Sequence, residues 1–134
     1  MIAVAAVSLP WMLASVGAGG ALGACLRWAV STWLNARWSV LPLGTLTCNL
    51  IGGLAIGILA AWFASHSAAS SAGKLFWMTG VLGGLTTFST FALESIELLA
   101  AGESLRALVH VTLHVVGSIA AAGLGFAAAR WLLG

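Results

Sequence analysis

The chain has no aspartate, no tyrosine and only three acidic residues in all, and charged residues make up just 6% of its 134 positions. A soluble domain carries roughly 25% charged residues, so this chain has too few to cover a surface that faces water. Three glutamates are a poor inventory for hydrolytic or multi-metal chemistry. The formal net charge of +2 is too small to favour nucleic-acid binding. We therefore expect neither an enzyme nor a nucleic-acid-binding protein.

Cysteine is scarce as well. Cys25 and Cys48 both lie in apolar stretches, and no spacing around them indicates zinc ligation or a redox pair. Each is predicted to be a small buried residue. Residues 22–25 resemble a lipoprotein cleavage site, but no lysine or arginine precedes them, so the positive segment of a signal peptide is missing. We expect no lipid attachment there.

What the chain has instead is apolar length, since 61% of its residues are hydrophobic. A helix needs roughly 20 mostly apolar residues to cross about 30 Å of hydrocarbon. Four stretches qualify, from about 11–34, 40–64, 75–100 and 108–133. Tryptophans lie near the ends of these stretches, as they do at membrane interfaces. The sequence predicts an all-α membrane protein, with residues 1–134 forming a single integral membrane domain in contact with lipid.

Glycines spaced four residues apart occur in three of the predicted spans. The pairs are Gly19 and Gly23, Gly53 and Gly57, and Gly80 and Gly84. Helices in lipid associate through close packing, which small residues allow. Glycine is also common in membrane helices generally. The pairs favour a tightly packed bundle and an oligomer.

Lysine and arginine are balanced between the two ends of the predicted bundle. Lys74 and Arg130 fall on the side of the termini, and Arg37 and Arg106 fall on the other side. Membrane orientation follows lysine and arginine asymmetry, and these four residues provide none. Arg27 adds to the Arg37 side if it lies near the interface. Balanced charge favours insertion in both orientations, and two opposed copies can then pair as an antiparallel dimer.

The second span contains Asn49 in its middle and Thr45 one turn earlier on the same face. A polar group in lipid costs free energy unless it has a partner. One interpretation is a hydrogen bond between helices, worth about 1 kcal/mol. The other is that the Asn49 amide donates to an anion that has lost its water.

The third span contains the most distinctive segment, residues 80–91. Its glycines are followed by hydroxyl residues, which are poor material for a continuous helix. A break in the membrane would expose carbonyl oxygens that can hold a small cation, with hydroxyl donors beside them. Phe88 and Phe91 would share a face and could present ring edges to an anion. The alternative is a kinked helix whose hydroxyls bond their own backbone and whose phenylalanines face lipid.

The fourth span places His110, His114 and Ser118 along one face. A polar stripe on an apolar helix is typical of a transport pathway. A histidine pair with this spacing can also hold a metal, but no acidic or cysteine partner is near it in the sequence. A third option is that neighbouring hydroxyls satisfy both rings. For Arg27 and Glu94 the alternatives are pairing with each other or extension to the interface.

Together these residues resemble the CrcB/Fluc fluoride channels over nearly the whole chain. The matching segments are residues 19–27 in the first span, residues 44–53 in the second, and residues 83–91 followed by Glu94 in the third. The third segment is the most specific of them. The resemblance implies an antiparallel, dual-topology homodimer in a bacterial inner membrane, with two pores that let fluoride leave the cell passively.

The resemblance also implies roles for individual residues. The backbone carbonyls of Gly83 and Thr86 would hold a central structural sodium ion shared by both subunits. The pore would include Asn49, Phe88, Phe91, Ser89, Thr90 and Ser118. Family members carry Tyr or Ser where this chain has His110 and His114. We place His114 in the pore, where its protonation would make conduction depend on pH. Supporting roles are assigned to Arg27, Glu94, Thr45, Thr87 and His110.

Two other classes of small membrane protein fit the size of the chain. A multidrug exporter with four spans and dual topology couples transport to protons through a glutamate in its first span, and this first span has none. A purely structural or assembly protein would not need the polar break in the third span. The fluoride channel is the interpretation that uses all of these features.

Overall fold

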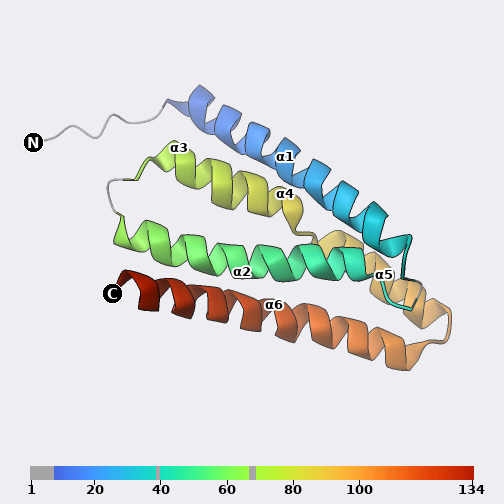
Figure 1. The fold of residues 1–134 in the computed structure, drawn as a ribbon. Helices are drawn as coiled ribbons and strands as arrows, with labels where there is room; N and C mark the ends of the chain where they lie inside the picture. Colours follow the sequence, from blue (N-terminus) through green and yellow to red (C-terminus); the bar gives the residue numbers. More distant parts are fainter. Residues whose placement is uncertain (1–7, 39, 67–68) are drawn as a thin grey trace, which may run out of the picture.

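The structure, a computed structural model, describes residues 8–38, 40–66 and 69–134. Four long helical segments lie side by side and alternate in direction (Figure 1). All four have the length and apolar composition needed to cross a membrane, which confirms the predicted number of spans. Every regular element in the described ranges is helical. Parts of two predicted connections, at Ser39 and at 67–68, lie outside those ranges.

The first, second and last spans are continuous helices. They are α1 (Leu9–Asn35), α2 (Leu43–Ser65) and α6 (Ser104–Leu133). The start of α2 is capped from α1, because the Asn35 side-chain oxygen accepts the Gly44 N–H at 2.8 Å. A buried first turn needs such a partner for its unbonded N–H groups. Asn35, the last residue of α1, therefore also caps the first turn of α2.

The third span is built from several pieces. It begins with α3 (Ser71–Lys74), continues as the π-helix η1 (Leu75–Leu82) and α4 (Gly83–Leu85), and resumes as α5 (Phe88–Ala100). Between α4 and α5, Thr86 and Thr87 are extended, with ψ angles of 154° and 124°. The predicted break is confirmed. The π-helical winding before it was not predicted.

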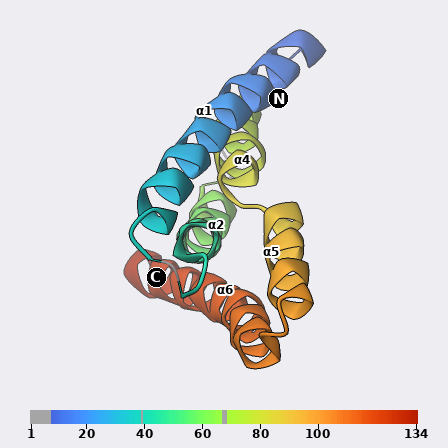
Figure 2. The same cartoon turned by 90° about the vertical axis from the view of Figure 1, so that its right-hand side faces the viewer.

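The break lets α5 leave the axis of the first half of its span. In Figure 2, α5 lies apart from α4 and turns down into α6. Gly102 has a φ of 76°, and the N–H groups of Gly102 and Glu103 bond back to Leu99 and Leu98. This glycine-terminated cap reverses the chain tightly. As a result α5 and α6 run side by side and bring their polar residues together.

Glycines bring the helix backbones into contact at two seams. In the first, between α1 and the η1–α4 segment, a Cβ on Gly19 or Gly23 would overlap the carbonyl of Phe76 or Val81. In the second, between α2 and α6, a Cβ on Gly57 would overlap the Ala122 carbonyl. Gly53, Gly80 and Gly84 also face backbone within 3.0 Å. The predicted close packing through these pairs is confirmed.

The two cysteines differ in their surroundings. Cys48 is 1% exposed and packs against Leu82 and Leu85, as predicted. Cys25 is exposed on α1, so the prediction that it is buried was wrong. Apolar neighbours in sequence do not decide which face of a membrane helix a residue occupies, because the lipid-facing side is apolar as well.

Candidate functional site

Two adjacent threonines end one helix and begin the next at the break. The N–H and the hydroxyl of Thr86 both donate to the Leu82 carbonyl, at 3.0 and 2.9 Å, which closes the first half of the span. The hydroxyl of Thr87 accepts the Thr90 N–H at 3.3 Å and caps the start of α5. The end of the first half of the span and the start of α5 are therefore each capped by a side chain of the break itself.

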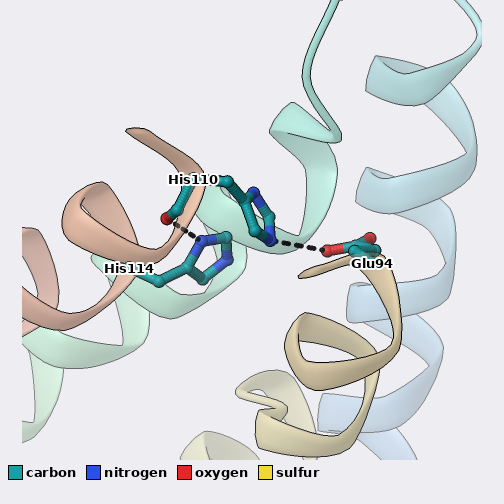
Figure 3. Close-up of side chains that lie close together, drawn as sticks. All are labelled: Glu94, His110 and His114. Carbon is teal, nitrogen blue, oxygen red and sulfur yellow. Dashed lines mark hydrogen bonds and ion pairs between the residues drawn. The ribbon is translucent and has the colours of Figure 1, made fainter. Parts of the chain in front are cut away.

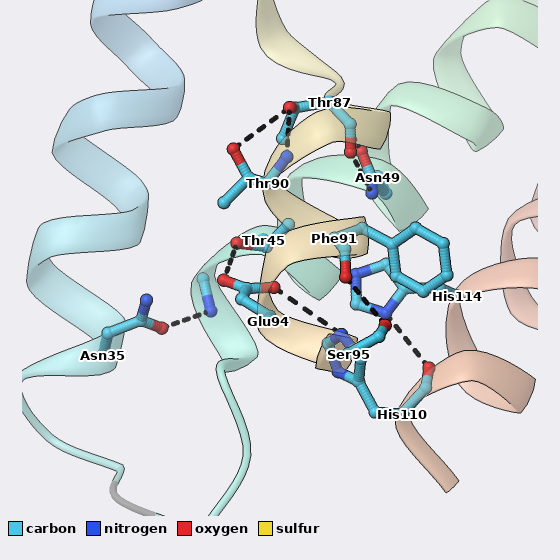
Figure 4. A network of polar contacts seen from close by, with 11 residues as sticks. Asn35, Thr45, Asn49, Thr87, Thr90, Phe91, Glu94, Ser95, His110 and His114 are labelled. Carbon is cyan, nitrogen blue, oxygen red and sulfur yellow. Dashed lines mark hydrogen bonds and ion pairs between the residues drawn. The ribbon is translucent and has the colours of Figure 1, made fainter. Parts of the chain in front are cut away.

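Asn49 of α2 holds the break from the side. Its amide oxygen accepts the Thr87 N–H at 2.8 Å, and its amide nitrogen donates to the Thr87 carbonyl at 3.1 Å (Figure 4). The amide replaces the helical partners that Thr87 lacks. An asparagine amide has two N–H donors, and this pair uses one of them. The sequence left open whether Asn49 bonds another helix or donates to an anion. The structure shows that it bonds the third span, and its second amide N–H is not used in this pair.

At the break, two N–H groups that would bond backbone carbonyls in a continuous helix bond side chains instead. In a continuous helix the Thr87 N–H would bond the Gly83 carbonyl, and the Thr90 N–H would bond the Thr86 carbonyl. Here Thr87 donates to Asn49, and Thr90 donates to the Thr87 hydroxyl. Gly83 and Thr86 thus have carbonyl oxygens whose helical donors are engaged elsewhere. These are the two residues predicted to hold sodium.

Arg27 of α1 binds the end of the first half of the span. Its Nε donates to the Gly84 carbonyl at 3.0 Å, where a cation is favourable because the last carbonyls of a helix carry partial negative charge. The suggested pairing of Arg27 with Glu94 was wrong. Glu94 instead contacts residues of α2 and α6. Arg27 therefore supports the break and not the acidic residue.

A cavity of about 540 Å³ lies beside the break, between α2, the third span and α6. Of the predicted site residues, it is lined by Asn49, Gly83, Thr86, Thr87, Phe88, Phe91, His114 and Ser118. Ser89 and Thr90 do not line it, and their hydroxyls lie 3.3 and 3.1 Å from the Thr87 hydroxyl. The cavity thus combines an apolar wall with a few polar groups, which is typical of a site for a small ligand.

Phe88 and Phe91 share a face of α5, as predicted from their spacing. Their ring centres are 5.4 Å apart in an edge-on arrangement, and the Phe91 ring stacks on His114 at 4.6 Å. Phe91 is buried, whereas Phe88 is 78% exposed. Both rings border the cavity. A ring edge carries partial positive charge, so a ring that turns its edge inward could meet an anion there.

Glu94 and the two histidines form a second polar group next to the cavity. The Thr45 hydroxyl donates to one Glu94 carboxylate oxygen at 2.6 Å, and His110 Nε2 lies 3.6 Å from the other. The His114 ring donates from Nδ1 to the His110 carbonyl at 3.1 Å (Figure 3). Sequence reasoning missed that Glu94 is the acidic neighbour of the histidine pair. The available signal was that Glu94 and His110 are equally far in sequence from Gly102, where the chain reverses.

Several known proteins are similar to this chain over most of its length. The family model described as CrcB-like protein, Camphor Resistance (CrcB), matches residues 14–126. A fluoride-specific ion channel FluC of Thiobacillus denitrificans is 47% identical over 118 residues, which cover 88% of this chain and 95% of that protein. The FluC of Aromatoleum aromaticum is 49% identical over 124 residues, covering 92% and 94%. The FluC of Acinetobacter baumannii is 45% identical over 122 residues, covering 91% and 96%.

Proposed function

Because this chain belongs to the CrcB-like protein family, we propose that it is a fluoride-selective ion channel that lets fluoride leave the cytoplasm passively. Its named relatives are ion channels and not enzymes. We place it in the inner membrane of a bacterial cell. The observation that carries the proposal is the cavity beside the broken third span, where hydrogen-bond donors and aromatic edges meet in an otherwise apolar wall.

The cavity offers a dehydrated anion several favourable contacts. The second N–H of the Asn49 amide and the Ser118 hydroxyl are neutral donors, and the edges of Phe88 and Phe91 carry partial positive charge. Neutral donors suit a channel, because an ion must bind strongly enough to enter and weakly enough to leave. We assign Asn49, Phe88, Phe91, Ser118 and His114 to the pore wall. Ser89 and Thr90 remain proposed as hydroxyls along the route.

We propose that two copies assemble antiparallel, with a pore on each side of the dimer. Several features support this arrangement. The cavity of a single chain is open, and the few polar groups in its wall would be left costly if they faced hydrocarbon. Phe88, at 78% exposed, is placed to meet a second copy. The balanced positions of Lys74, Arg130, Arg37 and Arg106 are consistent with insertion in both orientations.

We further propose a structural sodium ion at the break, shared by the two copies. The carbonyls of Gly83 and Thr86 fit it, since sodium is a hard cation that prefers oxygen ligands and the helical donors of both groups are diverted. When bound, sodium would be held by these carbonyl oxygens and would offset their partial negative charge. Arg27 would stabilise the neighbouring Gly84 carbonyl in the same way from within one chain.

The channel proposal is tested by anion efflux from liposomes that contain the purified protein. With fluoride inside, we expect efflux within the mixing time of a fluoride electrode after the membrane potential is released. With chloride inside, we expect no efflux above that of empty liposomes. Equal efflux of both anions would exclude selectivity. Absence of fluoride efflux from correctly folded protein would exclude the channel, and would favour a coupled transporter or a structural protein.

The assembly is tested by native mass spectrometry of the protein released from detergent. We expect a particle of twice the 13.6 kDa chain mass that retains one sodium ion after exchange into a volatile ammonium buffer. In sealed membrane vesicles, roughly half of the copies of a C-terminal tag should be cleaved by external protease, because antiparallel pairing requires both orientations. A monomeric particle, or a tag found on one side only, would contradict the dual-topology dimer.

A further inference from the structure

Three buried polar atoms that lack hydrogen-bond partners in the described part of the chain point at one another. They are Glu94 Oε2, His110 Nε2 and His114 Nε2 (Figure 3). Their side chains are well buried: His110 is 2% exposed, His114 is 4% exposed, and the Glu94 side chain is 12% exposed. A buried polar atom without a partner costs free energy, so three of them together indicate that a shared partner belongs there.

We propose that Glu94, His110 and His114 bind a divalent transition-metal ion, with zinc as the representative. The three ligand atoms lie within 4.8 Å of one another. His110 Nε2 and Glu94 Oε2 are 3.6 Å apart, close to the roughly 3.3 Å between neighbouring ligands of tetrahedral zinc with bonds of about 2.05 Å. The remaining separations are also below 4.8 Å, so we expect the three side chains to close onto one ion when it binds.

In Glu94 and His114, the polar atom that would not bind the metal already makes a hydrogen bond. His114 Nδ1 lies 3.1 Å from the His110 carbonyl, which can only accept, so Nδ1 carries the proton and Nε2 presents its lone pair. One Glu94 oxygen accepts the Thr45 hydroxyl at 2.6 Å, which leaves Oε2 as the ligand. Metal sites typically orient their ligands through such second contacts. Here hydrogen bonds within the chain provide these contacts.

The ligand set decides the class of ion. Two imidazoles and one carboxylate suit zinc and the neighbouring first-row metals, whereas sodium, calcium and magnesium prefer oxygen ligands. Three protein ligands leave a fourth position for water, as in zinc sites with an open position. The carboxylate charge offsets part of the charge of the ion in a poorly polarisable surrounding. The proposed metal is therefore distinct in kind from the sodium proposed at the break.

The site lies where two cavities approach each other. His114 lines the cavity beside the break, and Glu94 lines a second cavity of about 380 Å³ at the end of the bundle. The second cavity also includes Glu97, whose carboxylate attracts cations toward it, and Glu103, whose carboxylate is paired with Arg106. A metal can therefore reach the site from the membrane surface. Once bound, it would tie α5 to α6 beside the wall of the larger cavity.

The proposal predicts saturable zinc binding by the purified full-length protein, measured by equilibrium dialysis in a non-chelating buffer. We expect one ion per chain. Loss of an outer-sphere partner alone lowers metal affinity about 10- to 100-fold, so removal of a direct ligand in Glu94→Gln or His114→Asn should lower it at least about 100-fold. Both substitutions keep the hydrogen-bonding atom that faces Thr45 or the His110 carbonyl, so that the fold is preserved.

Two matched controls test whether the ion binds elsewhere. His66→Ala removes an exposed histidine, Cys25→Ala removes an exposed thiol, and both should bind zinc as the unmodified protein does. X-ray absorption at the zinc edge of the unmodified protein should show two imidazole ligands and oxygen, a result that depends on no variant. Unchanged affinity in Glu94→Gln, a spectrum with sulfur ligands, or no saturable binding would overturn the site. None of these readouts depends on fluoride conduction.

Discussion

Replacing Asn49 with leucine is expected to abolish fluoride efflux from liposomes. Leucine is similar in size to asparagine but offers neither an acceptor for the Thr87 N–H nor a donor for its carbonyl. Leaving each of these part-buried backbone groups unpaired would cost about 1–3 kcal/mol, and the pore would lose an amide donor. If the two unpaired groups together destabilise the conducting conformation by about 2.8 kcal/mol, its population falls about 100-fold, and we expect efflux to fall by at least that factor.

The matched control for this prediction is Thr112→Val. Thr112 is a polar residue of α6 whose exposed hydroxyl bonds the Leu108 carbonyl of its own helix, so its loss should leave efflux unchanged. Both variants should first be shown to elute as the same particle as the unmodified protein. Efflux at the unmodified rate in Asn49→Leu would show that the amide is needed neither for the break nor for the anion, and would remove Asn49 from the pore.

Introducing leucine at Gly125 is expected to prevent recovery of folded protein. A Cβ at this position would overlap the Leu54 carbonyl of α2, and a backbone atom cannot move aside as a flexible side chain can. Overpacking in a core usually costs about 1–3 kcal/mol, and a larger side chain against backbone should cost more. Because total stabilities are only about 5–15 kcal/mol, we expect aggregation and a strongly lowered thermal midpoint.

Gly123→Leu is the control, since it lies in the same helix two residues earlier. No atom lies within 4 Å of a Cβ built at Gly123, and leucine is a better helix former than glycine. This variant should keep its yield and thermal midpoint, as measured by size-exclusion chromatography and fluorescence on heating. Equal loss of folded protein in both variants would show that a general requirement for glycine in α6, and not contact with α2, is responsible.

The break in the third span could be predicted from residues close together in sequence. Paired glycines followed by two threonines predicted an interruption, and Thr86 and Thr87 do end and begin helices with their own side chains. These bonds span only three or four residues, so the sequence contains both partners. The partner of Arg27 could not be predicted in this way, because it lies on another helix and depends on how α1 is rotated against the third span. Of the two alternatives that the sequence left open for Arg27, pairing with Glu94 was wrong, and the Gly84 carbonyl is the partner found.

The histidine pair shows both what spacing along a helix predicts and what it does not. His110 and His114 share a face of α6, which their spacing predicted. No acidic residue lies near the pair in sequence, yet Glu94 approaches His110 across the turn at Gly102. Spacing along one helix constrains that helix alone. The position and rotation of α5, which carries Glu94, depend on the direction that the chain takes after the break at Thr86 and Thr87.

The sequence by itself determined the four spans, the interruption of the third and the glycine seams. Each of these depends on a property that a short stretch of chain carries alone: apolar length, low helix propensity or the absence of a side chain. Only the tertiary structure decided that Asn49 pairs with Thr87, that Glu94 meets the histidines and that Cys25 is exposed. The physical reason is that nearly all faces of a membrane helix are apolar, so packing between helices, and not local pattern, sets which residues meet.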